Sequence, residues 1–117
     1  MDFEIQKIQD YTLIKVLSEK LDTNNAPDLK SELVAINSVG EKNIILDVRN
    51  CEYCDSSGLS AILVANRLCE DAIGTFILTG LQPDFEQIIK ISMLHTVLLI
   101  TRTVEEAENL LKEKENL

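Results

Sequence analysis

The most reactive side chains of this sequence lie in one short stretch, from Cys51 to Leu59. Two adjacent serines, Ser56 and Ser57, stand directly after Asp55 and before Gly58. A serine hydroxyl can accept a phosphoryl group, which brings about 1.5 to 2 negative charges and three strong acceptor oxygens. The same residue types commonly cap the start of a helix, so helix capping alone also explains the cluster.

Serine nucleophiles in enzymes need a general base within reach, and His95 is the only histidine of this chain. The sequence has no Gly-x-Ser-x-Gly elbow, and its four glycines form no phosphate-binding loop. No other spacing of residues is typical of catalysis. We therefore expect a protein that is not an enzyme and holds no cofactor.

Cys51 and Cys54 form a C-x-x-C pair between a predicted strand and a predicted helix, which is where thioredoxin-like proteins place a redox pair. Here no Trp precedes the pair, a Glu lies inside it, and the predicted helix begins after the second cysteine. Free thiols that pack as small apolar residues at a strand end are the simpler interpretation. A redox module remains an alternative.

Zinc binding is a second alternative, because three thiols and one imidazole form a possible ligand set. These residues are Cys51, Cys54, Cys69 and His95. However, the second Cys pair or Cys-x-x-His of a zinc ribbon is missing, and Cys69 falls on a predicted helix. We therefore predict no metal site.

Predicted strands and helices alternate along the chain and position the polar stretch. The strands are predicted at 3–8, 11–17, 43–48, 75–79 and 96–100, and the helices at 26–39, 56–72, 83–91 and 103–114. A hairpin-like turn joins the first two strands, whereas the others need crossover connections and thus parallel pairing. The sequence therefore predicts one α/β domain over residues 1–117, with a mixed, mostly parallel sheet, an antiparallel N-terminal edge hairpin and about four helices.

The predicted helix after the serines carries no charged residue from Ser56 to Asn66. Its apolar side chains surround most of the helix, and they include Leu59, Ile62, Leu63 and Val64. Such a helix is either packed inside the core or presents one apolar face to a partner. Both interpretations stay open at this point.

Composition and charge exclude several function classes. Eleven Lys and Arg against 20 Asp and Glu give a net charge of −9, which divides into −5 before residue 60 and −4 after it. This negative charge repels nucleic acids and anionic membrane surfaces. No apolar run approaches the roughly 20 residues of a membrane span. A start without secretion-signal features and an odd number of cysteines lead us to expect a cytoplasmic protein.

Asp55-Ser56-Ser57-Gly58-Leu59 after a strand resembles the signature of the STAS family, the fold of the bacterial anti-sigma factor antagonists. Three other segments resemble the family more weakly. Its first loop and helix start are similar to Leu21-Asp22 with Ala26-Pro27-Asp28-Leu29. Its later helix openings are similar to Leu81-Gln82-Pro83 and Thr103-Val104-Glu105-Glu106-Ala107. The resemblance covers nearly the whole chain. Two departures are Glu19-Lys20 before the first loop, where the family often has Gly-Glu, and Met93-Leu94, where it often has Gly-Leu.

The resemblance implies that a partner kinase, which is also the anti-sigma factor, phosphorylates the first serine of the signature. Residue by residue, it implies that Ser56 is the acceptor, with Ser57 as second choice. It places Asp22 and Asp55 at acidic positions of the partner-binding surface, beside Ser57, Gly58 and Leu59. It further implies that the kinase supplies ATP and Mg²⁺ and that a metal-dependent serine phosphatase removes the phosphate.

We therefore predict an anti-sigma factor antagonist that binds its partner when Ser56 is unmodified and releases it when Ser56 is phosphorylated. The alternative within the same fold is a docking subunit, without a switch, of a sensory assembly or a transporter complex. Either role requires the serine hydroxyl or its surroundings to be reachable from solvent.

Overall fold

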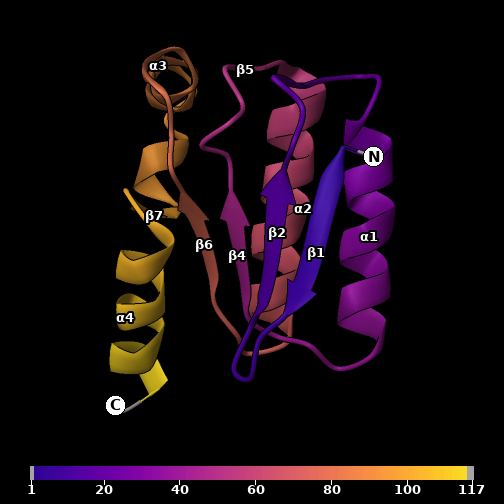
Figure 1. Cartoon of the computed structure of the whole chain (residues 1–117), viewed down its shortest axis with the longest axis vertical. Helices are drawn as coiled ribbons and strands as arrows, with labels where there is room; N and C mark the ends of the chain where they lie inside the picture. Colours follow the sequence, from indigo (N-terminus) through magenta and orange to yellow (C-terminus); the bar gives the residue numbers. More distant parts are fainter. Residues whose placement is uncertain (1, 116–117) are drawn as a thin grey trace.

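A five-stranded sheet forms the centre of the computed structural model, which describes residues 2–115 (Figure 1). Its strands lie in the order β1 (Phe3–Lys7), β2 (Thr12–Val16), β4 (Ile44–Asp47), β6 (Phe76–Thr79) and β7 (Leu99–Thr101). β1 pairs antiparallel with β2, and all other neighbours pair in parallel. The predicted mixed sheet with an antiparallel edge hairpin is confirmed.

Four helices surround this sheet, as predicted. α1 (Ala26–Ser38) and α2 (Ser56–Asp71) lie side by side on one face, and α4 (Val104–Glu115) covers part of the other face (Figure 1). α3 (Pro83–Ile91) lies at the end of the sheet where β6 terminates. No helix of residues 2–115 combines the length and the apolar character needed to cross a bilayer.

Alternate side chains of the central strands pack into two separate cores, because successive side chains of a strand point to opposite faces. In β4, Ile44 and Leu46 join the core under α1 and α2, whereas Ile45 joins the smaller core under α4. All three side chains are buried. The continuous apolar run of this strand therefore reflects coverage on both faces.

Two short strands were not predicted, and one predicted strand is partly wrong. β3 (Lys20–Leu21) and β5 (Tyr53–Cys54) form a separate two-stranded parallel sheet. The strand predicted at 96–100 begins only at Leu99, because a left-handed turn at Met93 (φ 63°) leads into a 3₁₀ helix, η1 (Leu94–Thr96). The apolar character of Val97 suggested a strand, but its side chain is exposed.

Candidate functional site

The small β3–β5 sheet joins the loop before α1 to the loop before α2. Leu21 pairs with Cys54, and two amides of the second loop donate to the Glu19 carbonyl at 2.7 and 3.2 Å. The Asp55 amide donates to the Leu21 carbonyl at 3.2 Å. Because the two strands are parallel and in register, Asp22 and Asp55 follow them at the same edge. The structure thus brings the two predicted acidic positions together.

Gly58 fixes the first turn of α2 against the first loop. A Cβ atom at this position would lie 2.5 Å from the Cys54 sulfur and closer still to the Leu21 carbonyl oxygen. Any side chain would therefore force the helix away from the loop. The contribution of Gly58 to partner binding stays a prediction, whereas its role in packing α2 against the first loop follows from these distances.

Asp55 caps the N-terminus of α2. Its Oδ1 accepts a hydrogen bond from the Gly58 amide at 3.0 Å, and its carbonyl accepts one from Leu59 at 3.0 Å. The amides of Ser56 and Ser57 have no hydrogen-bond acceptor within residues 2–115. These two N–H groups and the partial positive charge of the helix end form a position where an anion is stabilised.

The structure separates the two candidate serines. Ser56 is the first residue of α2 and is exposed, whereas Ser57 is half-buried. Ser56 is therefore the more accessible of the two serines. Leu59, also predicted to contact a partner, is half-buried and packs against the main core.

Core packing accounts for most of the uncharged part of α2. Ala61, Ile62 and Ala65 are fully buried, and Val64 is half-buried. Leu63 remains 40% exposed. Of the two interpretations that the sequence left open, burial against the sheet explains the helix beyond its first turn, and only a small apolar surface is left for a partner.

The cysteines lack the properties of a redox pair. Cys51 and Cys54 are both free and buried. Burial raises the pKa of the Cys54 thiol to about 12 and raises that of Cys51 as well. Reactive cysteines have a lowered pKa, since the thiolate is the nucleophile. These two thiols instead pack as part of the main hydrophobic core.

The four potential zinc ligands do not converge. Cys69 is buried near the C-terminal end of α2, and His95 is exposed in η1. Across residues 2–115, no group of three or more His, Cys, Asp or Glu side chains is placed to hold a metal ion.

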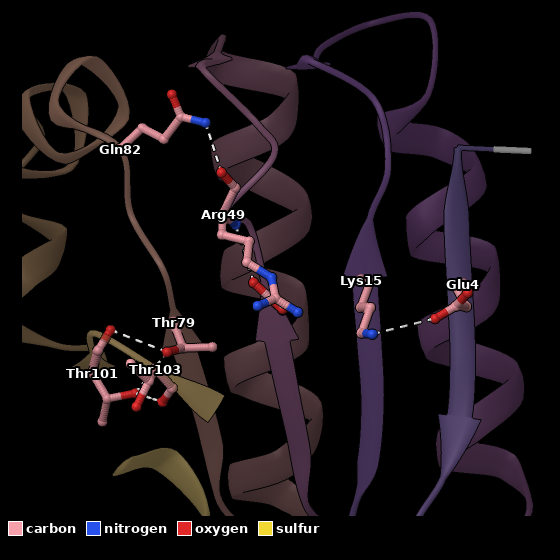
Figure 2. Close-up of polar contacts among 8 residues, drawn as sticks. Glu4, Lys15, Arg49, Thr79, Gln82, Thr101 and Thr103 are labelled. Atoms are coloured by element: carbon pink, nitrogen blue, oxygen red, sulfur yellow. Dashed lines mark hydrogen bonds and ion pairs between the residues drawn. The ribbon is translucent and has the colours of Figure 1, made fainter. Parts of the chain in front are cut away.

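A polar row crosses the sheet on the α4 side, near the carboxyl ends of the parallel strands. Strand register aligns its members Glu4, Lys15, Asp47, Thr79 and Thr101 (Figure 2). Lys15 pairs with Glu4 at 3.6 Å, and the Thr101 hydroxyl donates to Thr79 Oγ1 at 2.8 Å. The row therefore satisfies much of its own polarity, and sequence reasoning did not identify it.

Arg49 links this row to a cleft of about 710 Å³ beside β6 and β7. Asp47 is buried, with Oδ1 accepting the Arg49 amide and Oδ2 3.1 Å from Arg49 Nε. Gln82 donates to the Arg49 carbonyl at 2.6 Å (Figure 2). The cleft also contains Arg102 and two glutamates, so its charges are mixed. We interpret these contacts as structural, because they connect the segment after β4 to the segment after β6.

Comparison with known proteins gives the same family that the signature suggested. A model of the STAS domain matches residues 2–107. BtrV of Bordetella bronchiseptica, named as a candidate anti-sigma factor antagonist, is 28% identical over 107 residues, which cover 92% of this chain and 91% of BtrV. A serine-to-glutamate variant of RsbS from Moorella thermoacetica superimposes with a TM-score of 0.85 at 22% identity, covering 100% of both chains.

The anti-sigma factor antagonist SpoIIAA has the same fold in two states. Its unphosphorylated form superimposes with a TM-score of 0.74 at 20% identity, over 94% of this chain and 97% of SpoIIAA. Its phosphorylated form, from Bacillus, gives 0.72 at 19% identity, over 92% and 98%. The family match extends over both loops of the candidate site and all five strands of the main sheet. The chain therefore belongs to the STAS domain family.

Proposed function

We propose that this chain is an anti-sigma factor antagonist whose docking is switched by phosphorylation of Ser56. The observation that carries the proposal is the exposed Ser56 hydroxyl at the start of a capped helix. The name of BtrV and the existence of a phosphorylated form of SpoIIAA in the same fold support it. The chain itself acts as a binding protein, and no catalytic role is assigned to its residues.

The domain is able to carry a phosphoryl group on Ser56 without unfolding. The free amides of Ser56 and Ser57 and the N-terminal end of the α2 dipole favour negative charge at this position. Asp55 keeps its own hydrogen bond to Gly58, so the cap does not depend on the serine side chain. Phosphorylation would therefore change the surface and leave the fold in place.

The charges around Ser56 explain how the phosphoryl group would act on a partner. Glu19, Asp22, Glu52 and Asp55 all lie on the two loops joined by the β3–β5 sheet. The phosphoryl group would add about 1.5 to 2 negative charges to this already acidic surface. In a docked complex it would have to lose its water, and we expect binding to become at least about a hundredfold weaker.

The partner in this proposal is a kinase-type anti-sigma factor, which brings ATP, Mg²⁺ and the catalytic groups. A metal-dependent serine phosphatase would restore the unmodified chain. All three proteins would meet in the cytoplasm of a bacterium.

The proposal is tested by incubating the purified chain with ATP and the kinase-type anti-sigma factor of the same organism, followed by mass spectrometry of the modified peptide. We expect one phosphate on Ser56 and none on the Ser56→Ala variant. Ser60→Ala, on the same helix, serves as the matched control and should be phosphorylated as wild type. Phosphate at a distant residue, or an unchanged yield on Ser56→Ala, would contradict the proposal.

A further inference from the structure

Asn25 is the residue before α1, but its side chain does not cap that helix. Its Oδ1 accepts a hydrogen bond from the Asp22 amide at 2.9 Å, and its Nδ2 donates to the Lys20 carbonyl at 2.8 Å. The side chain is turned back into the preceding loop, and the residue is only 3% exposed. An Asn at a helix start normally accepts from an amide of the first turn, so another role is indicated here.

The two bonds of Asn25 hold the backbone on both sides of Leu21. Leu21 is the residue that pairs with Cys54, accepts from the Asp55 amide and packs against Gly58. Asn25 therefore holds β3 in place, and the start of α2 packs against this strand. The position of the first turn of α2, which carries Ser56, therefore depends on the hydrogen bonds of Asn25.

The chemistry of the contact requires both ends of an asparagine amide. One end must accept from an N–H group and the other must donate to a carbonyl. Ser or Thr is too short to reach both groups, and an aspartate offers no donor for the Lys20 carbonyl. We propose that Asn25 is a positioning residue for partner docking and for phosphorylation of Ser56. This inference rests on the proposed function.

Asn43 provides a matched control at the opposite end of the sheet. It is 5% exposed, donates through Nδ2 to the Asp10 carbonyl and to Glu115, and accepts from the Thr75 amide at 2.9 Å. Replacing either asparagine removes buried hydrogen bonds and lowers global stability. Only Asn25 contacts the loop that supports α2, so the two variants should differ in their local effects.

The first measurement is amide hydrogen exchange on Asn25→Ala, Asn25→Asp and Asn43→Ala, with no partner present. We expect the Asp55 and Gly58 amides to exchange about tenfold faster in both Asn25 variants, relative to the Ile45 amide in the same protein. In Asn43→Ala this ratio should stay at the wild-type value. An unchanged ratio in the Asn25 variants would overturn the positioning role.

The second measurement is the dissociation constant for the kinase-type anti-sigma factor, together with KM and kcat for Ser56 phosphorylation. We expect both Asn25 variants to bind about tenfold more weakly and to show a higher KM with little change in kcat, while Asn43→Ala matches wild type. Equal affinities for Asn25→Ala and Asn43→Ala would refute the inference alone. Failure of the wild-type chain to bind or to be phosphorylated would instead refute the proposed function.

Discussion

The two ends of α2 are attached to the rest of the molecule in the same way but present different surfaces. At each end a glycine packs against a neighbouring loop: Gly58 against Leu21, and Gly74 against Lys42. At the N-terminal end, two residues before the glycine, lies the exposed Ser56, in a turn that Asp55 caps. At the C-terminal end it is Ile73, 88% exposed in the left-handed conformation, with φ of 59°.

The difference shows that close packing can override backbone preference. α2 ends with the hydrogen bonds of a Schellman motif, from Ile73 to the Glu70 carbonyl at 3.0 Å and from Gly74 to the Cys69 carbonyl at 2.7 Å. Glycine is favoured at the left-handed position of that motif. Here the glycine lies one residue later, where Lys42 leaves no room for a side chain, and Ile73 takes the strained position.

The largest stability effects are expected from Gly58→Ala and Gly74→Ala. In both, the new Cβ overlaps a backbone carbonyl, so the loop and the end of the helix must move apart. Each should lower the free energy of unfolding by about 3 kcal/mol or more, measured by urea denaturation. Gly40→Ala is the control, because its Cβ meets no atom within 4 Å and only its φ of 89° is unfavourable. A loss at Gly58 no larger than at Gly40 would show that the loop does not hold this end of α2.

The buried thiols of Cys54 and Cys69, near the two ends of α2, report on how tightly each end is packed. Burial raises the pKa of both Cys54 and Cys69 to about 12. Since the neutral thiols are favoured in the folded state, their contribution to stability is complete below the ordinary thiol pKa. It is lost as the pH rises from there towards 12. Iodoacetamide at pH 8 should therefore leave both thiols unmodified in the native protein and alkylate them in urea. Rapid native alkylation of Cys54 alone would mean that the N-terminal end opens.

Asp55→Ala should have a smaller effect on stability, about 1 kcal/mol, because one capping hydrogen bond is lost. Thr103 accepts from the Glu106 amide at 3.1 Å before α4, so Thr103→Ala is a matched loss of a cap. Both variants should show similar drops in urea denaturation, but only Asp55→Ala should weaken partner binding. Equal binding by the two variants would remove Asp55 from the docking surface.

Ile73→Gly is expected to raise the free energy of unfolding by about 0.5 to 1 kcal/mol. The left-handed strain of isoleucine, roughly 1–2 kcal/mol, exceeds the added flexibility of glycine in the unfolded chain. Val39→Gly is the control, because Val39 is an exposed β-branched residue after α1 at a negative φ of −94°. A gain in stability at Val39, or none at Ile73, would indicate that the C-terminal end is not strained.

The sequence predicts the order of the larger elements well, because long apolar runs and amphipathic stretches carry a strong periodic signal. It does not reveal β3 and β5, since two-residue strands have no periodicity and depend on contacts between distant loops. The late start of β7 was missed for a related reason. The left-handed turn at Met93 is a tertiary feature that an apolar run does not indicate.

The residues of the candidate site were accessible to sequence reasoning as a cluster, but their individual exposure was not. Ser56 and Ser57 have the same chemistry, and only the orientation of the first turn of α2 makes one exposed and the other half-buried. Asn25 was not identified, because an asparagine before a helix predicts an ordinary cap. Its contacts with Lys20 and Asp22 become visible only when the loop is folded.

Isothermal titration calorimetry with the kinase-type anti-sigma factor, on wild type, Ser56→Asp and Ser57→Asp, distinguishes a switch at Ser56 from docking that is insensitive to charge at this site. We expect the exposed position to dominate: Ser56→Asp should bind at least about a hundredfold more weakly than wild type, at unchanged stability. Ser57→Asp should have a clearly smaller effect on affinity. Equal dissociation constants for wild type and Ser56→Asp would contradict the switch and leave only the STAS fold established.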